Sequence, residues 1–179
     1  GVPKRIEVRI GGFGGQGVVL AGEILGRAAA YEGKYVVQTQ SYGAEARGST
    51  ARSEVIISDS KIDFPKVRKC DILVAMSQNA LEAHLKDLKE KGVLIVDKDK
   101  VEHLPQTKAK VFKIPATKTA VKLLESRLYA NVIMLGALTK ITGIVKEKAV
   151  EKAIIDSVPE TAREANIKVF RKGLKCVAT

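Results

Sequence analysis

Short runs of β-branched and other apolar residues alternate along this chain with longer segments in which apolar residues recur at helical spacing. The short runs predict strands at residues 5–10, 35–38, 51–57, 70–76, 93–96 and 111–114. The longer segments predict helices at residues 16–30, 78–89, 117–124, 131–141, 146–155 and 160–166. This order is typical of βαβ units. It predicts an α/β fold of three layers with a mostly parallel sheet and a helical C-terminal third.

A chain of 179 residues has the usual size of one domain, and no linker or internal repeat divides it, so we expect residues 1–179 to form a single domain. Apolar residues make up 45% of the chain and charged residues 28%, which is an ordinary globular balance. No apolar run is long enough to cross a bilayer, and the first residues lack the pattern of a secretory signal. We therefore expect a cytoplasmic protein with no membrane contact.

The net charge of +11 raises two interpretations: nucleic-acid binding, or binding of an anionic ligand and an acidic partner protein. Lysines are spread along the chain and interleaved with acids, aromatic residues make up only 4%, and tryptophan is absent. Base-stacking platforms are therefore scarce, and we expect no nucleic-acid partner. The basic segment 168–175 is either a solvated end or a docking edge, and the sequence does not choose between them.

Residues 12–17 read Gly-Phe-Gly-Gly-Gln-Gly, which places the G-x-G-x-x-G pattern directly after a predicted strand and at the start of a predicted helix. In such a motif Gly12 permits a tight turn, Gly14 lets the backbone approach a phosphate, and Gly17 lets the helix pack against the strand. The helix N-terminus adds free N–H groups and a partial positive charge. The pattern predicts a Rossmann-like fold with a phosphate-bearing ligand, and the alternative is a purely structural glycine turn.

The residues that would complete a dinucleotide site are missing. A nicotinamide enzyme carries an acid at the end of its second strand, about 20 residues beyond the glycines, to bind ribose hydroxyls. Residues 36–40 of this chain read Val-Val-Gln-Thr-Gln, with neither an acid for NAD nor an arginine for the 2′-phosphate of NADP. Both nicotinamide cofactors are therefore disfavoured.

A second motif, Ser-Tyr-Gly-Ala-Glu-Ala-Arg-Gly-Ser at residues 41–49, is predicted to be a loop at the carboxyl end of the second strand. Ligands bind at that edge of a parallel sheet. Glu45 and Arg47 could present a carboxylate and a guanidinium to a ligand or to a neighbouring subunit, and the glycines permit unusual backbone angles. The alternative is an ordinary connection with a surface ion pair.

Isolated polar residues carry weaker signals. Asp97 and Asp99 follow a strand and could bind magnesium, but a turn or cap role is commoner for aspartate in such a place. His84 and His103 have no partner nearby in the sequence, so we expect surface residues rather than acid–base groups. The two cysteines lie far apart with no metal-ligand spacing around them, so this chain alone cannot hold an iron–sulfur cluster.

Together, the two motifs resemble those of the γ subunit of 2-oxoacid:ferredoxin oxidoreductases. The resemblance lies in Ile-Gly-Gly-Phe-Gly-Gly-Gln-Gly-Val at residues 10–18 and in Ser-Tyr-Gly-x-Glu-x-Arg-Gly at residues 41–48. It continues through residues 62–65, 71–77, 114–117 and 131–137 and covers most of the chain. The Ser-Tyr-Gly form is more similar to the 2-oxoglutarate branch of the family than to the pyruvate branch. Ala44 and Ser49 depart from the family pattern, in which Pro and Gly are common at these positions.

The resemblance implies a reaction that this chain does not perform alone: coenzyme A-dependent oxidative decarboxylation of 2-oxoglutarate, with ferredoxin accepting the electrons. It assigns thiamine diphosphate, magnesium and iron–sulfur clusters to the α, β and δ partner subunits, and coenzyme A partly to this one. It implies no catalytic or metal-binding residue here. Residues of the glycine turn would face phosphates through backbone N–H groups. The residues implied to lie at coenzyme A or at a subunit interface are Gly12, Gly14, Gly15, Gln16, Gly17, Ser41, Tyr42, Glu45 and Arg47.

Other interpretations stay open. The chain could be the γ subunit of a pyruvate or branched 2-oxoacid enzyme, because the resemblance places substrate contacts mainly in the thiamine-binding subunits. It could also be a stand-alone nucleotide-binding protein of Rossmann-like fold, although it lacks a set of catalytic residues. Without its partners, the chain could form a homodimer through an apolar patch left uncovered.

Overall fold

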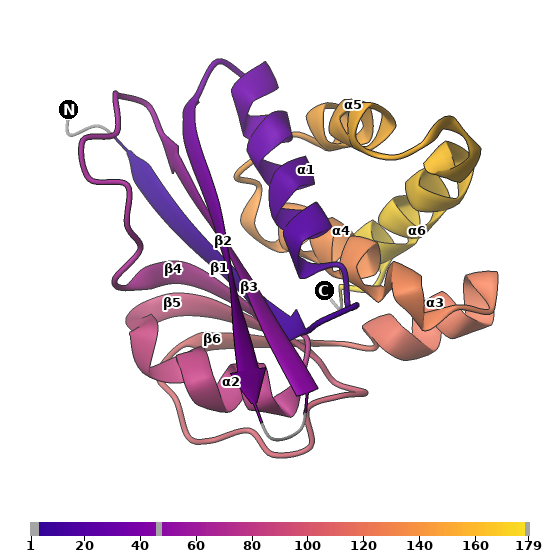
Figure 1. Cartoon of the computed structure of the whole chain (residues 1–179), viewed down its shortest axis with the longest axis horizontal. Coiled ribbons are helices and arrows are strands. Elements are labelled where there is room, and N and C mark those ends of the chain that lie inside the picture. The colour runs from indigo at the N-terminus through magenta and orange to yellow at the C-terminus, as the bar shows by residue number, and fades with distance from the viewer. Residues whose placement is uncertain (1–3, 46–47, 178–179) are drawn as a thin grey trace.

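Six strands form one mixed sheet in the computed structural model, which describes residues 4–45 and 48–177 (Figure 1). The strands are β1 (Arg5–Phe13), β2 (Tyr35–Glu45), β3 (Gly48–Ser58), β4 (Cys70–Ala75), β5 (Leu88–Asp97) and β6 (Lys110–Ile114). They lie in the order β2-β3-β1-β4-β5-β6. The neighbours β1, β4, β5 and β6 are parallel, whereas β3 runs antiparallel to both β1 and β2. The mostly parallel sheet is therefore confirmed, with an antiparallel hairpin at one edge.

Helices cover both faces of the sheet, which confirms the three predicted layers. The helices are α1 (Val18–Tyr31), α2 (Gln78–His84), α3 (Ala116–Leu124), α4 (Ala130–Thr142), α5 (Glu147–Ser157) and α6 (Arg163–Lys175), with short 3-10 turns η1 (Leu85–Asp87), η2 (Arg127–Tyr129) and η3 (Glu160–Ala162). Figure 1 shows α1, α4, α5 and α6 on one face and α2 on the other. Two hydrophobic clusters correspond to these two faces, and the chain after β6 is helical, as predicted.

The loop predicted at residues 41–49 is wrong, because this segment belongs to two strands. β2 continues to Glu45 and β3 begins at Gly48, and in the register between them Ser41 pairs with Arg52. An antiparallel partner satisfies the backbone hydrogen bonds of glycine, alanine and serine, which have little strand propensity of their own. Pairing between the strands thus overrides the local turn chemistry of the motif.

Two helix ends also differ from the prediction. The helix expected at residues 78–89 ends at His84, and β5 already begins at Leu88. Leu88 is buried and pairs with Cys70 of β4, so its place in the core outweighs the helical pattern of the segment. The last helix is longer than the predicted 160–166, because α6 continues through the whole basic segment near the C-terminus.

A pair of glycines allows α4 and α6 to cross in close backbone contact. A Cβ atom added at Gly136 of α4 would lie 2.9 Å from the Cα atom of Gly173, and still closer to the carbonyl oxygen of Phe170. A Cβ atom added at Gly173 of α6 would lie 3.0 Å from the Cα atom of Gly136. Because α4 is buried over most of its length, this crossing fixes the helical third of the chain against the rest of the core.

Candidate functional site

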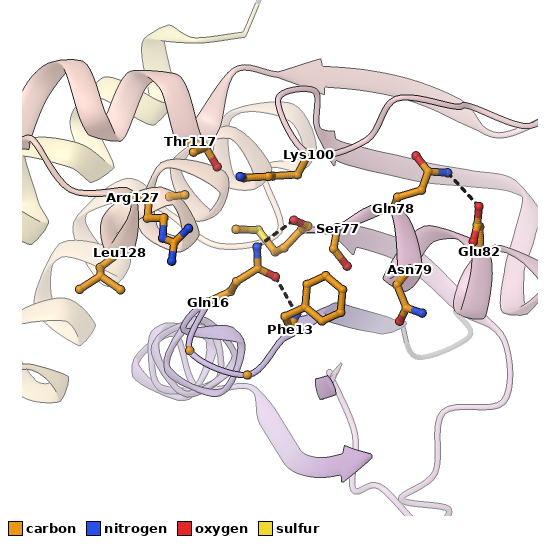
Figure 2. A pocket seen from close by; sticks show the side chains of 14 residues that line it. Phe13, Gln16, Ser77, Gln78, Asn79, Glu82, Lys100, Thr117, Arg127 and Leu128 are labelled. Atoms are coloured by element: carbon orange, nitrogen blue, oxygen red, sulfur yellow. Dashed lines mark hydrogen bonds between the residues drawn. The ribbon is translucent and has the colours of Figure 1, made fainter. Parts of the chain in front are cut away.

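A pocket of about 850 Å³ opens at the carboxyl edge of the parallel strands (Figure 2). It lies between the turn after β1, the start of α2, the loop after β5, and the starts of α3 and η2. Its lining residues are Phe13, Gly14, Gly15, Gln16, Met76, Ser77, Gln78, Asn79, Glu82, Lys100, Thr117, Arg127, Leu128 and Ala130. Open α/β sheets bind their ligands at this edge, and the volume lies in the range of small-molecule sites.

The glycine turn is shorter than predicted, and two of its amides are already engaged. β1 continues through Phe13, so the turn begins at Gly14. Gly14 N–H donates to the carbonyl oxygen of Ser49 at 2.9 Å, and Gln16 N–H donates to that of Phe13 at 3.2 Å. Both amides therefore already have partners within the protein, and the expectation that they face a phosphate stays a prediction. Gly15 lines the pocket with a φ of 88°, a left-handed conformation that glycine adopts without strain.

The side chain of Gln16 holds the turn against the end of β4. Its Oε1 atom accepts a hydrogen bond of 2.7 Å from Phe13 N–H, and its Nε2 atom donates one of 3.1 Å to the carbonyl oxygen of Met76 (Figure 2). Both ends of the amide are thus used within the protein. Gln16 therefore positions the turn at the pocket wall.

Gly12 and Gly17 do not line this pocket and serve packing instead. A Cβ atom at Gly12 would lie 3.0 Å from that of Met76, and one at Gly17 would lie 2.7 Å from Cγ of Asn131. Asn131 also donates a hydrogen bond of 3.1 Å from Nδ2 to the carbonyl oxygen of Gly17. These two glycines let β1, α1 and α4 approach one another, which is the structural role that the alternative interpretation of the motif gives them.

Two cationic side chains, Lys100 and Arg127, extend into the pocket from segments that are separate in the sequence (Figure 2). Within residues 4–45 and 48–177, neither forms a hydrogen bond or an ion pair through its side chain. Glu82 is the acidic residue of the lining, and its carboxylate accepts a hydrogen bond from Gln78 at 3.3 Å. The cations are therefore available to an anionic ligand, and a phosphate group suits both of them.

Asp97 is buried at the end of β5 and ties this strand to the start of α3. Its Oδ2 atom accepts a hydrogen bond of 2.6 Å from the Thr117 hydroxyl, and its Oδ1 atom accepts one of 3.1 Å from Asp99 N–H. Burial raises the pKa of Asp97 above its ordinary value, while these hydrogen bonds act in the opposite direction. The turn or cap role predicted for Asp97 is confirmed, and the loop that it fixes carries Lys100.

A smaller recess of about 290 Å³ lies between the β2–β3 hairpin and α2. Ser41, Tyr42 and Arg52 of the hairpin line it together with His84 of α2, and it shares Asn79 with the larger pocket. Arg52 Nε donates to the Ser41 hydroxyl at 2.7 Å, and Tyr42 is 69% exposed. Ser41 and Tyr42 of the second motif thus lie beside the larger pocket but do not line it.

Of the charged pair of the second motif, the structure describes the backbone of Glu45. Glu45 ends β2, where its backbone pairs with that of Gly48. Arg47 lies outside the described residues. The roles implied for both residues stay predictions.

His84 is not the surface residue that the sequence predicts. It is half-buried, and its Nδ1 atom lies 3.4 Å from Nη1 of Arg9. Burial, followed by the charges of Arg9 and Arg52, lowers the pKa of His84 to about 4. Arg9 is 3% exposed and also pairs with Asp87 at 2.6 Å and with Glu54 at 3.2 Å. Because an arginine only donates, His84 is neutral and carries its proton on Nε2.

Lys100 and Arg127 line the pocket but are not among the residues that the two motifs predict for it. Lys100 comes three residues after the end of β5, and the rule that ligands bind at the carboxyl ends of parallel strands could have pointed to it. Arg127 lies in a 3-10 turn between two helices and has no pattern that marks it. Within the described parts of the chain, no group of His, Cys, Asp and Glu side chains could hold a metal ion.

The fold and the pocket define an α/β protein with two cationic side chains in a pocket at the edge of its sheet. The sequence profile of the family described as pyruvate ferredoxin/flavodoxin oxidoreductase matches residues 7–176, and the chain belongs to this family. It is 53% identical over 175 residues to the 2-oxoglutarate synthase subunit KorC of Methanocaldococcus jannaschii, and the match covers 96% of this chain and 94% of that protein.

Two solved structures share the fold. The keto/oxoacid ferredoxin oxidoreductase γ subunit from Geobacter sulfurreducens PCA is 43% identical, with a TM-score of 0.85 and coverage of 95% of this chain and 96% of that one. The 2-oxoglutarate:ferredoxin oxidoreductase from Magnetococcus marinus, with 2-oxoglutarate, coenzyme A and succinyl-CoA bound, has a TM-score of 0.85. At 23% identity, covering 97% of this chain and 31% of that one, it bears on the fold alone.

The resemblance in the two motifs is therefore confirmed: this chain is a γ-type subunit of a multi-subunit 2-oxoacid:ferredoxin oxidoreductase. The chain therefore acts as one component of a multi-subunit enzyme. None of the helices in the described ranges is both long and apolar enough to span a membrane.

Proposed function

We propose that this γ subunit serves a 2-oxoglutarate:ferredoxin oxidoreductase and that the pocket at the sheet edge binds the phosphates of coenzyme A. In the reaction, 2-oxoglutarate loses carbon dioxide, its acyl group passes to the coenzyme A thiol, and two electrons pass to ferredoxin. The α, β and δ subunits would hold thiamine diphosphate, magnesium and the iron–sulfur clusters that supply this chemistry. The 53% identity to a 2-oxoglutarate synthase subunit supports the choice of oxoacid.

The observation that carries the coenzyme A proposal is the pair of cations without partners in the pocket. Lys100 and Arg127 extend into a cavity that has the size of a small-molecule site. On the other wall, Gly15 precedes α1, whose first N–H groups have no partner inside the helix and favour negative charge. Phosphate oxygens in the pocket would accept hydrogen bonds from Lys100 and Arg127, and the partial positive charge at the N-terminus of α1 would add to the attraction.

The second motif has a different role in this proposal. Tyr42 is largely exposed beside the smaller recess, and Ser41 is already bonded to Arg52. An exposed aromatic side chain at the end of a hairpin is a typical anchor of a protein interface. We assign Ser41, Tyr42, Glu45 and Arg47 to contact with a neighbouring subunit next to the bound coenzyme A.

The test of the coenzyme A site is a steady-state comparison of complexes reconstituted by coexpression with the partner subunits. Replacing Lys100 and Arg127 by methionine removes two charge-assisted contacts, each worth about 1.5 kcal/mol or roughly tenfold. We expect the KM for coenzyme A to rise by about tenfold for each change, with little change in the KM for the oxoacid. The matched control replaces Lys98 and Lys122, exposed lysines that do not line the pocket. An unchanged KM for coenzyme A in the double variant would place the phosphates elsewhere.

The oxoacid is tested in the same reconstituted complex. Reduction of a ferredoxin-type dye should require coenzyme A, should require this chain, and should be fastest with 2-oxoglutarate. A preference for pyruvate or for a branched 2-oxoacid would instead assign the subunit to that branch of the family. It would not affect the coenzyme A proposal.

A further inference from the structure

A groove of about 740 Å³ lies among the C-terminal helices and shares no lining residue with the pocket at the sheet edge. Its apolar part consists of Leu123 of α3, Ile155 of α5 and Ile167 of α6. Ile155 is 40% exposed, and the other two side chains are half-buried. Three helices therefore leave apolar surface in contact with solvent at a single place.

The exposed face of α6 lines this groove with a stripe of cations. The cationic lining residues are Arg163, Lys168, Arg171, Lys172 and Lys175. Lys168, Arg171, Lys172 and Lys175 lie within little more than two helical turns on the exposed side of α6, and Arg163 stands at its first residue. The opposite side, with Val169 and Phe170, is buried.

The charge of this stripe is neutralised only in part. Arg171 forms two hydrogen bonds to the carboxylate of Glu151, at 2.9 and 3.1 Å. Glu164 is the acidic residue of the lining. The side chains of the three lysines in the stripe form no hydrogen bond or ion pair with any residue that the structure describes. A row of positive charge therefore borders the apolar surface.

We propose that this groove docks an acidic amphipathic helix of a partner subunit, an inference that rests on the assignment of the chain to a multi-subunit enzyme. Apolar side chains on one side of such a helix would cover Leu123, Ile155 and Ile167, and flanking carboxylates would meet the lysine stripe. The 13 residues of α6 give the stripe a length of about 20 Å, enough for three to four turns of a partner helix. The basic segment that the sequence left undecided is thus a docking edge.

Other occupants fit the groove less well. A single-stranded nucleic acid needs aromatic platforms, and no aromatic side chain is among the lining residues. An anionic membrane needs apolar side chains that project beyond the cations, whereas here the lysines are exposed and Leu123 and Ile167 are half-buried. A second copy of this chain would bring an identical positive stripe, and the two stripes would repel each other.

Charge reversal tests the proposal in the complex assembled by coexpression of all subunits. The variant Lys168→Glu with Lys172→Glu places two acids in the middle of the stripe. We expect its complex to dissociate at a salt concentration at least several-fold lower than that of the unmodified complex. The control variant, Lys91→Glu with Lys113→Glu, makes the same change in net charge at two exposed lysines outside the groove. It should leave the salt dependence unchanged.

A second measurement identifies the occupant and excludes a folding defect. A carbodiimide joins lysine amines directly to carboxylates, and mass spectrometry of the treated complex should show links from Lys168, Lys172 or Lys175 to one acidic segment of another subunit. The variant Ile155→Ser, at an exposed position that leaves the stripe intact, should weaken assembly at every salt concentration. Circular dichroism checks that each variant keeps its helices.

Two results would overturn the proposal. One is a complex of unchanged stability in both the charge-reversed and the Ile155→Ser variants. The other is carbodiimide links that join only copies of this chain. The failure of the coenzyme A proposal is distinguishable, because replacement of Lys100 and Arg127 changes the KM for coenzyme A in a complex that assembles normally, whereas the groove variants change assembly.

Discussion

The close crossing of α4 and α6 predicts that a glycine-to-alanine substitution there lowers the stability of the fold. The same substitution in another helix should raise it. In Gly136→Ala, the added methyl group would lie 2.9 Å from both the Cα atom of Gly173 and the backbone nitrogen of Leu174, and closer still to the carbonyl oxygen of Phe170. All three are backbone atoms of α6, so no single side chain can move aside. The two helices must separate, which loosens the contacts around them.

The magnitude follows from two opposing effects. Alanine is favoured over glycine inside a helix by about 1 kcal/mol. Overpacking of a core costs about 1–3 kcal/mol and occasionally more, and three contacts with fixed backbone put this site at the upper end. We expect Gly136→Ala to lower the free energy of unfolding by about 2 kcal/mol. For a chain of this size, this corresponds to a decrease in Tm of about 4–8 °C.

The control is Gly26→Ala in α1, where the added methyl group would lie 3.4 Å from Cγ1 of Val36, a normal contact. Helix propensity then dominates, and Tm should rise by about 2–4 °C. Gly173→Ala should resemble Gly136→Ala, and the double variant should lose less than the sum, because the helices have already separated. Thermal and urea unfolding followed by circular dichroism give the Tm and the free energy of unfolding of the four variants and of the unmodified chain. A Tm for Gly136→Ala equal to or above that of the unmodified chain would refute the close-packed crossing.

Three further predictions concern single polar groups. The pKa of His84 is about 4 in the folded chain, against an ordinary value of 6.5, so the unfolded chain binds the proton more readily. The free energy of unfolding should therefore fall as the pH decreases from 6.5 to 4. In urea unfolding measured across this pH range, His84→Gln should reduce that fall. Arg9→Leu removes the buried cation that pairs with both Asp87 and Glu54, leaving Glu54 only its longer contact with Arg52, and should cost about 3 kcal/mol in the same assay, far more than replacement of an exposed ion-pair residue. Ser77 accepts a hydrogen bond of 3.1 Å from Ala80 N–H at the start of α2, and Ser77→Ala should cost about 1 kcal/mol in thermal unfolding, with no loss expected if the cap is unimportant.

The order of strands and helices could be predicted from the sequence because most elements carry their own periodicity. The apolar run of β4 and the buried helix α4 are examples, since each is continuous and each is bounded by residues that end it. The hairpin could not be predicted. Ser41, Gly43 and Ala44 have little strand propensity, and they form a strand only because β3 supplies partners along the whole of β2. The pairing of two strands cannot be predicted from the sequence of either strand alone.

Some features of the candidate site could likewise be predicted from the sequence, and others could not. The glycine motif located the turn and the correct edge of the sheet, because strand, turn and helix follow one another directly in the chain. The engaged amides of Gly14 and Gln16 could not be predicted, since Gly14 is bonded to Ser49 of a strand that was expected to begin later. Lys100 and Arg127 meet in the pocket only because β5 and α4 bring their two connecting segments together. Convergence of this kind depends on the fold.

The missing acid at the end of the second strand follows from the topology. In a dinucleotide-binding fold that strand lies next to the first and parallel to it, so its last residue reaches a ribose bound at the glycine turn. Here β3 takes the place beside β1 and runs in the opposite direction, so Ser49 at its start meets the turn instead. The carboxyl end of β2 is one strand further out, displaced by about 5 Å. A nucleotide in the pocket would therefore have no ribose contact from β2, and in our proposal Lys100 and Arg127 bind its phosphates from the facing wall (Figure 2).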